Sequence, residues 1–161
     1  MLILFYIELI IEENEMAEAT SKIVNMRLIM KLYEEIVKPV GRSYELTPME
    51  MNIISFLHNN PEFDTASDIA AYRSFPKSNV SQGVWALQKE GYLRCVPYDE
   101  DKRKMHLYLT RKCLPVISDI DECVKKMSSV MFSDFTPEER ELYGAFQRRV
   151  VHNAKEYLEK I

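Results

Sequence analysis

The stretch TASDIAAYRSFPKSNVSQGVWALQKEG, Thr65–Gly91, predicts two helices joined by a very short turn. Thr65 can cap the first helix with Asp68 at its third position, and this helix is expected to end near Arg73. The second helix is expected over residues 76–90, because Gly91 then stops it. Since only about three residues separate them, the two helices are predicted to form a helix-turn-helix.

The second of these helices has one apolar and one polar face. Val80, Val84 and Leu87 recur at helical spacing and are predicted to be buried. The early turns expose polar or basic side chains, which are Lys77, Ser78, Asn79, Ser81 and Gln82. These residues are either ordinary helix surface or contacts to DNA base edges and phosphates.

A charged hairpin follows the two helices. The segments YLRCV, residues 92–96, and MHLYL, residues 105–109, alternate as two strands do. The tip between them carries a basic triplet, which is Lys102, Arg103 and Lys104. The triplet is either a solvated turn or, because it follows a helix-turn-helix, a wing tip beside the minor groove. Asp101 would then hold Arg103 through a carboxylate pair or simply face water.

Further helices are predicted on both sides of this unit. A Thr-Pro-x-Glu capping box at residues 47–50 opens a helix that ends near NNPE, with Leu46 able to pack onto Met51. Upstream, the apolar spacing predicts an amphipathic helix over residues 15–38, which Pro39 and Gly41 would end. The fold class is therefore mainly α with a small β-hairpin wing, a winged helix-turn-helix.

The segment after the hairpin is predicted to form two more helices. Residues 111–132 are predicted as one helix, and a second capping box at Thr136–Glu139 opens the other. The last helix presents a stripe at helical spacing, which is Leu142, Phe146, Val150 or Asn153, and Tyr157. A lone winged unit would leave this stripe and that of residues 23–37 uncovered, so pairing of two chains through the terminal helices is predicted.

These segments resemble the multiple-antibiotic-resistance regulator (MarR) family. The resemblance lies in LTPMEMNIISFL, DIAAYRSFPKSNVSQGVWALQKEGYL and DEDKRKMHLYLT, and the D-x-R followed by L-T is its most telling part. It implies one domain over residues 1–161, with a DNA-binding unit at 46–110 and dimerisation helices at 16–45 and 111–161. A homodimeric transcriptional regulator, usually ligand-responsive, that binds near-palindromic operators in double-stranded DNA is the implied function.

Three positions depart from the family pattern. Ser74 stands in the helix-helix turn where the family usually has Gly, and Lys102 stands where it has Arg. RKCLP replaces the usual Glu-x-Gly after Leu-Thr, so the next helix is expected to start late, with Pro115 in its first turn.

A group of apolar residues and Trp85 each have two possible roles. Met26, Met30, Tyr33 and Met51 either belong to the core or line a pocket for a small hydrophobic effector. Trp85 shares a helix face with Ser81 and Gln82, and it either packs under the wing or touches the DNA backbone.

The charge is unevenly distributed along the acidic chain. Residues 65–113 hold nine basic and five acidic side chains, a net charge of +4, while the whole chain carries -4 and the remainder therefore -8. Because phosphate attraction dominates affinity for DNA, a basic module on an acidic body fits a nucleic-acid-binding protein.

Other functions find little support in the sequence. With Gly only at 41, 83, 91 and 144, the chain has no phosphate loop, nucleophile elbow or dinucleotide fingerprint, so no enzyme or cofactor is predicted. Cys95, Cys113 and Cys123 form no C-x-x-C pair and no ligand spacing with histidines, which predicts reduced thiols in a cytosol and no metal. A winged helix used only for protein interaction is the alternative to DNA binding.

The apolar opening MLILFYIELII is too short for a membrane helix, which needs about 20 residues. No membrane anchor is therefore predicted. The opening either precedes a true start at Met16 or Met26, or is an apolar strip buried in an oligomer.

Overall fold

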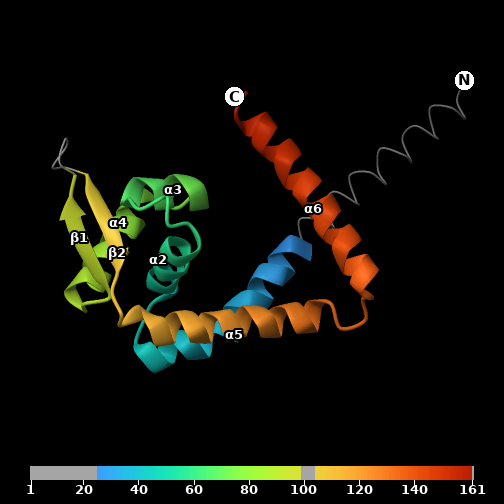
Figure 1. Cartoon of the computed structure of the whole chain (residues 1–161), viewed down its shortest axis with the longest axis horizontal. Helices are drawn as coiled ribbons and strands as arrows, with labels where there is room; N and C mark the ends of the chain where they lie inside the picture. Colours follow the sequence, from blue (N-terminus) through green and yellow to red (C-terminus); the bar gives the residue numbers. More distant parts are fainter. Residues whose placement is uncertain (1–24, 99–103, 161) are drawn as a thin grey trace, which may run out of the picture. The chain divides into compact units, whose positions relative to one another are not determined.

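The computed structural model describes residues 25–98 and 104–160 (Figure 1). These divide into a first unit that ends at Val124 and a second that begins at Lys125. The first holds a helix over residues 25–44 and then α2 (Pro48–Asn59), α3 (Ala66–Arg73), α4 (Lys77–Lys89), β1 (Leu93–Pro97), β2 (Met105–Leu109) and the start of α5 (Cys113–Met131). The second holds the end of α5 and all of α6 (Pro137–Leu158). The predicted fold class, a mainly α winged helix-turn-helix, is confirmed.

Three helices begin at capping boxes, as the sequence predicted. In the first, the Thr47 backbone N–H donates to the Glu50 carboxylate at 2.7 Å, and the Glu50 N–H donates to the Thr47 hydroxyl at 3.3 Å. The reciprocal pairs are Thr47 with Glu50, Thr65 with Asp68, and Thr136 with Glu139. Each box satisfies backbone donors that a helix start otherwise leaves open.

The helix over residues 25–44 runs past its predicted end, so the expectation that Pro39 and Gly41 break it was wrong. Pro39 removes only one backbone donor. Val40, next to it, is buried in the core, and this burial favours continuing the turn. The helix ends at Glu45, whose φ of 55° lies in the left-handed region, and the Leu46 N–H donates back to the Gly41 carbonyl at 2.8 Å.

The same end geometry recurs at two other helices. After α3, Ser74 has φ 54° and the Phe75 N–H donates to the Ala70 carbonyl at 3.0 Å. After α4, Gly91 has φ 79° and the Tyr92 N–H donates to the Leu87 carbonyl at 2.8 Å. Both are Schellman-type helix ends. Gly is the residue usually preferred at the left-handed position, and only the end after α4 has it.

Replacing Ser74 with Gly is expected to raise the free energy of unfolding by roughly 0.5–1 kcal/mol. A left-handed conformation costs an L-residue about 1–2 kcal/mol, and the greater freedom of Gly in the unfolded chain offsets part of the gain. The urea midpoint should rise with an unchanged m-value. Ser74→Val is the control and should lower the midpoint, whereas a midpoint that falls for Ser74→Gly contradicts the prediction.

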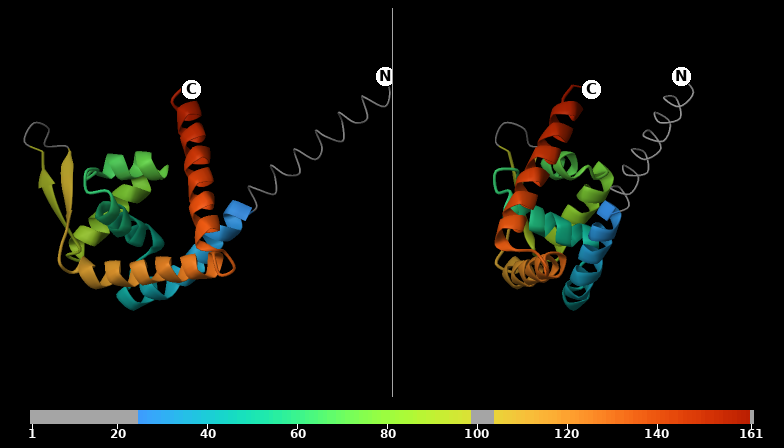
Figure 2. Two further views of the ribbon diagram at one scale, coloured as in Figure 1. Left: turned by 45° about the vertical axis from the view of Figure 1, so that its right-hand side comes forward. Right: turned by 90° about the vertical axis from the view of Figure 1, so that its right-hand side faces the viewer.

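The core of the first unit lies where α2, α3, α4 and the hairpin meet (Figures 1 and 2). Its fully buried side chains include Ile53, Phe56, Ile69, Val80 and Leu87. The end of the 25–44 helix runs antiparallel to the start of α5. The Tyr44 hydroxyl donates to Asp119 at 2.8 Å, and the Cys123 thiol donates to the Ile36 carbonyl at 3.4 Å. As predicted, Pro115 lies in the first turn of α5.

The hairpin is antiparallel, with Leu93 opposite Leu109 and Pro97 opposite Met105. Leu93 and Leu107 are buried on its inner face. On the other edge of β2, the Leu107 N–H donates to the carbonyl of Asp64 at 2.8 Å. The loop before α3 therefore adds a single backbone contact to the two-stranded sheet.

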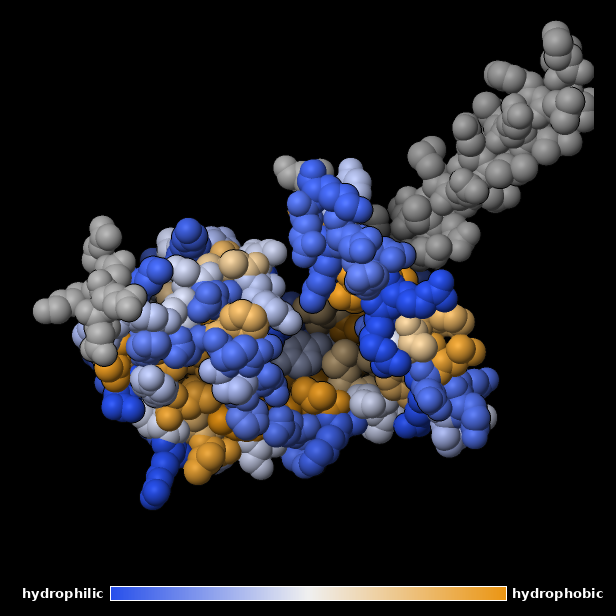
Figure 3. All heavy atoms as spheres, turned by 45° about the horizontal axis from the view of Figure 1, so that its top comes forward, coloured by the Kyte–Doolittle hydropathy of each residue, from blue (hydrophilic) through white to orange (hydrophobic). Residues whose placement is uncertain are grey.

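In the second unit, α6 has no buried residue. Its exposed apolar side chains include the predicted stripe of Leu142, Phe146, Val150 and Tyr157. On the face seen in Figure 3, apolar side chains in orange gather in patches among hydrophilic ones in blue. The described chain therefore leaves apolar surface open to water.

Candidate nucleic-acid interface

The helix α4 buries one face and exposes the other. The five side chains predicted to contact DNA on it are all exposed: Lys77, Ser78, Asn79, Ser81 and Gln82. Val80 and Leu87 are buried as predicted, but Val84 is only half-buried.

Gly83 is buried on the inner face because α2 passes very close to it. A Cβ at this position would lie 2.6 Å from the Cδ1 of Ile53 and 3.2 Å from the Cγ of Met49. This close approach fixes the rotation of α4 on α2. The polar face of α4 consequently points away from the core.

The first turn of α4 suits an anion. Its N-cap residue, Pro76, makes no side-chain hydrogen bond to the N–H groups that open the helix. Open N–H groups and the helix dipole attract negative charge, and Lys77 adds a full positive charge at the same end. A DNA phosphate has the charge and acceptor oxygens for this position.

The described part of the hairpin carries further basic side chains. Lys104 is exposed, and its carbonyl accepts a hydrogen bond from the Tyr98 N–H at 3.0 Å. The Arg94 guanidinium lies 4.9 Å from the ring centre of Tyr108 on the outer face. Asp101, Lys102 and Arg103 lie outside the described residues, so their roles at the tip stay predictions.

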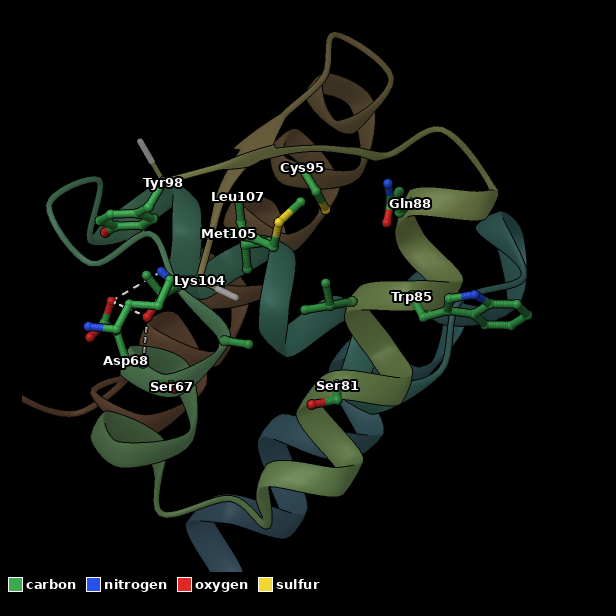
Figure 4. A pocket seen from close by; sticks show the side chains of 13 residues that line it. Ser67, Asp68, Ser81, Trp85, Gln88, Cys95, Tyr98, Lys104, Met105 and Leu107 are labelled. Carbon is green, nitrogen blue, oxygen red and sulfur yellow. Dashed lines mark hydrogen bonds between the residues drawn. The ribbon is translucent and has the colours of Figure 1, made fainter. Parts of the chain in front are cut away.

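A half-open cavity of about 390 Å³ lies between α3, α4 and the hairpin (Figure 4). Cys95, Met105 and Leu107 line it from the strands, and Ser81 lines it from α4. Trp85 is 62% exposed, and it is also one of the residues of α4 that line this cavity. The Lys89 ammonium lies 5.3 Å from the centre of the Trp85 ring. Packing under the wing and contact with the DNA backbone both stay predictions for Trp85.

The comparisons with known proteins agree with this architecture. The MarR family model matches residues 44–104, from the end of the first helix to the base of the second strand. Over these residues the chain is similar to the MarR family. No curated protein matches the chain.

Solved structures of MarR-family proteins have the same fold. The crystal structure of MarR superposes with a TM-score of 0.74 at 19% identity, covering 84% of this chain and 92% of that one. A MarR-family regulator from Silicibacter pomeroyi gives 0.68 at 22% identity, covering 80% and 86%. A complex of MepR from S. aureus with DNA gives 0.66 at 16% identity, covering 80% and 94%.

No pocket in the described part of the chain is lined by all four predicted effector residues. Met26 and Met30 are exposed and line an open groove on the 25–44 helix, whose lining does not include the other two. Tyr33 is half-buried, while Met51 is buried in the core beside Gly41. An effector pocket made of these residues stays a prediction.

Cys95 and Cys113 are weak nucleophiles. Burial raises the pKa of the Cys113 and Cys95 thiols, so they stay protonated near neutral pH. Among residues 25–98 and 104–160, no group of three or more His, Cys, Asp or Glu side chains could hold a metal ion. None of the helices in this part of the chain is long and apolar enough to cross a membrane.

Proposed function

We propose that the chain is a transcriptional regulator that lays α4 in the major groove of DNA and its hairpin beside the minor groove. The exposed polar face of α4, held outward by the close contact at Gly83, is the observation that carries the proposal. The net charge of +4 over residues 65–113 supports it, and so does the existence of a DNA complex of MepR, which has the same fold.

The side chains of α4 have distinct tasks in this proposal. Asn79 and Gln82 carry amides that can pair with the N6 and N7 atoms of adenine. Ser78 and Ser81 can bond either bases or phosphates, and Lys77 binds a phosphate. The amides read the sequence, while the basic groups hold α4 on the duplex.

The regulator acts as a homodimer on a near-palindromic operator. Two copies joined through their terminal helices present two α4 helices, which reach half-sites about 34–36 Å apart along the duplex. The exposed stripe on α6 supports this assembly because water-exposed apolar surface of that kind favours a partner. A bound dimer occludes the promoter, which makes repression the proposed outcome.

A small hydrophobic or aromatic effector releases the operator. Such a ligand shifts the equilibrium only if it binds the DNA-incompetent dimer more tightly than the DNA-bound one. If a candidate effector binds free and operator-bound protein with identical affinity, that compound does not release the operator.

The test is binding to the promoter region of the protein's own gene, measured by fluorescence anisotropy at several salt concentrations. The proposal requires tighter binding to that DNA than to a scrambled duplex, and an affinity that falls steeply with salt. Absence of a selective, salt-sensitive response would favour a winged helix that binds only proteins.

Arg103→Ala is expected to weaken operator binding by roughly 1–3 kcal/mol and to lower the salt slope by about one unit. A guanidinium at a wing tip is drawn into a narrow A·T-rich minor groove, whereas Lys102 and Lys104 meet phosphates. Lys102→Ala is the control and should have a smaller effect that is similar on operator and scrambled DNA. Unchanged affinity and slope for Arg103→Ala, in a protein with wild-type melting temperature, would mean that the triplet is a solvated turn.

A further inference from the structure

We propose that Asp64 is a positioning residue that fixes the hairpin relative to α3 and α4 and thereby aims the wing at DNA. The inference rests on the proposed function and deepens it. It begins from the place of Asp64 in the chain, directly before Thr65, the residue that caps α3.

Asp64 contacts the hairpin through its backbone and its side chain. Its carbonyl accepts from the Leu107 N–H at 2.8 Å. Its carboxylate lies 2.7 Å from Nδ1 of His106 and 3.4 Å from the hydroxyl of Tyr98. Because an ionised carboxylate can only accept, the hydrogen between Asp64 and His106 belongs to the imidazole.

The contacts reach both strands at the base of the wing tip. Tyr98 follows β1, and His106 lies in β2. The two rings stack with their centres 3.6 Å apart and their planes at 12°. The Tyr98 N–H also donates to the Lys104 carbonyl at 3.0 Å, which closes the ladder below the tip. Asp64 therefore holds the two strands together where the basic tip begins.

The contact between Asp64 and His106 is partly shielded from water. The side chain of Asp64 is 23% exposed and that of His106 is 30% exposed, so water competes only partly for their hydrogen bond. Burial and the nearby Asp64 carboxylate raise the pKa of Tyr98, which keeps its hydroxyl a donor.

The other end of the connection leads directly to α4. The Thr65 hydroxyl donates to the Asp68 carboxylate at 2.6 Å, and the Thr65 N–H donates to it at 3.1 Å, so the residue after Asp64 is fixed to the first turn of α3. Three residues, Ser74, Phe75 and Pro76, separate α3 from α4. A change at Asp64 is therefore expected to alter the angle between the wing and α4 while leaving the core intact.

The sign of the effect separates positioning from simple charge. A carboxylate near DNA repels phosphates, so removing its charge alone would tighten binding. A positioning role predicts weaker binding when the acceptor is lost. Asp64→Asn distinguishes the positioning role from the charge effect, because it removes the charge and keeps an oxygen that can accept a hydrogen bond from His106.

The experiment compares full-length wild type, Asp64→Ala, Asp64→Asn and His106→Phe on operator DNA across a salt series. Glu62→Ala, which removes an exposed carboxylate from the same loop, is the control. Asp64→Ala and His106→Phe are expected to weaken binding by about tenfold and to lower the salt slope by about one unit, because wing contacts to phosphates are lost. Asp64→Asn and Glu62→Ala should stay within about twofold of wild type or bind slightly tighter.

Melting temperatures identify any variant that fails to fold, and His106→Phe gives a second route to the same contact. If the wild-type protein binds operator DNA selectively, and both Asp64→Ala and His106→Phe bind it as tightly as the wild type or more tightly, the inference about Asp64 is overturned while the proposed function stands. An Asp64→Asn variant that binds as weakly as Asp64→Ala overturns it as well. A wild-type protein without selective, salt-sensitive DNA binding removes the proposed function and this inference together.

Discussion

Phe146→Asp is expected to turn the proposed homodimer into a monomer and to weaken operator binding by about 100- to 10,000-fold, because the second α4 no longer binds as part of the same molecule. Phe146 is 51% exposed and lies in the middle of the α6 stripe. A carboxylate there would have to lose its hydration in an apolar interface without a partner. Deleting residues 136–161 removes the whole stripe and should give the same monomer.

The matched control is Arg148→Gln, which changes the net charge by the same amount. By the helical period, Arg148 lies on the other side of α6 from the stripe. Sedimentation velocity at micromolar concentration gives the assembly state, and anisotropy on operator DNA gives the affinity. A wild-type monomer, or a Phe146→Asp protein that remains dimeric, would contradict the proposed interface.

Helix starts could be predicted from the sequence because their determinants are local. A capping box needs only a Thr and an acidic residue three positions later, so the starts of α2, α3 and α6 follow from the residues themselves. The helix-turn-helix and the hairpin follow from hydrophobic period and from Gly91. The first strand begins one residue later than expected, because the Tyr92 N–H still donates to the Leu87 carbonyl at the end of α4, and the second strand lies at the predicted residues.

Helix ends were harder to predict because the core can override local preferences. Pro39 and Gly41 are helix breakers in isolation, yet burial of Val40 carries the helix past them. Glu45 and Ser74 adopt left-handed backbone without being Gly. Only the tertiary fold specifies these two positions.

The candidate site was predictable only in part for the same reason. The polar face of α4 follows from spacing along one helix, and the structure leaves all five of its predicted residues exposed. The contact between Asp64 and His106 joins residues 42 positions apart in different elements. A single sequence holds no signal for such a pair, and the same applies to the contact between Gly83 and Ile53.

Gly83→Val is expected to lower the free energy of unfolding by about 3 kcal/mol, at the upper end of the usual cost of overpacking. The Cβ alone would lie 2.6 Å from the Cδ1 of Ile53 and 3.2 Å from the Cγ of Met49. Ile53 is fully buried, so its methyl group has no free space into which to move. Either α4 moves away from α2 or the core around Ile53 repacks.

Gly144→Val is the matched control, since Gly144 also lies in a helix interior but its Cβ would meet only the Arg148 side chain, at 3.4 Å. Val forms helix somewhat better than Gly, so this variant should be neutral or more stable by a few tenths of a kcal/mol. Urea midpoints should be compared at one fixed protein concentration, because the stability of a dimer depends on it. Since the contact at Gly83 also sets the direction of the polar face of α4, the folded Gly83→Val protein should bind operator DNA more weakly than Gly144→Val. Equal midpoints for the two variants would mean that α4 can separate from α2 at no cost, and the rotation of α4 would then need another cause.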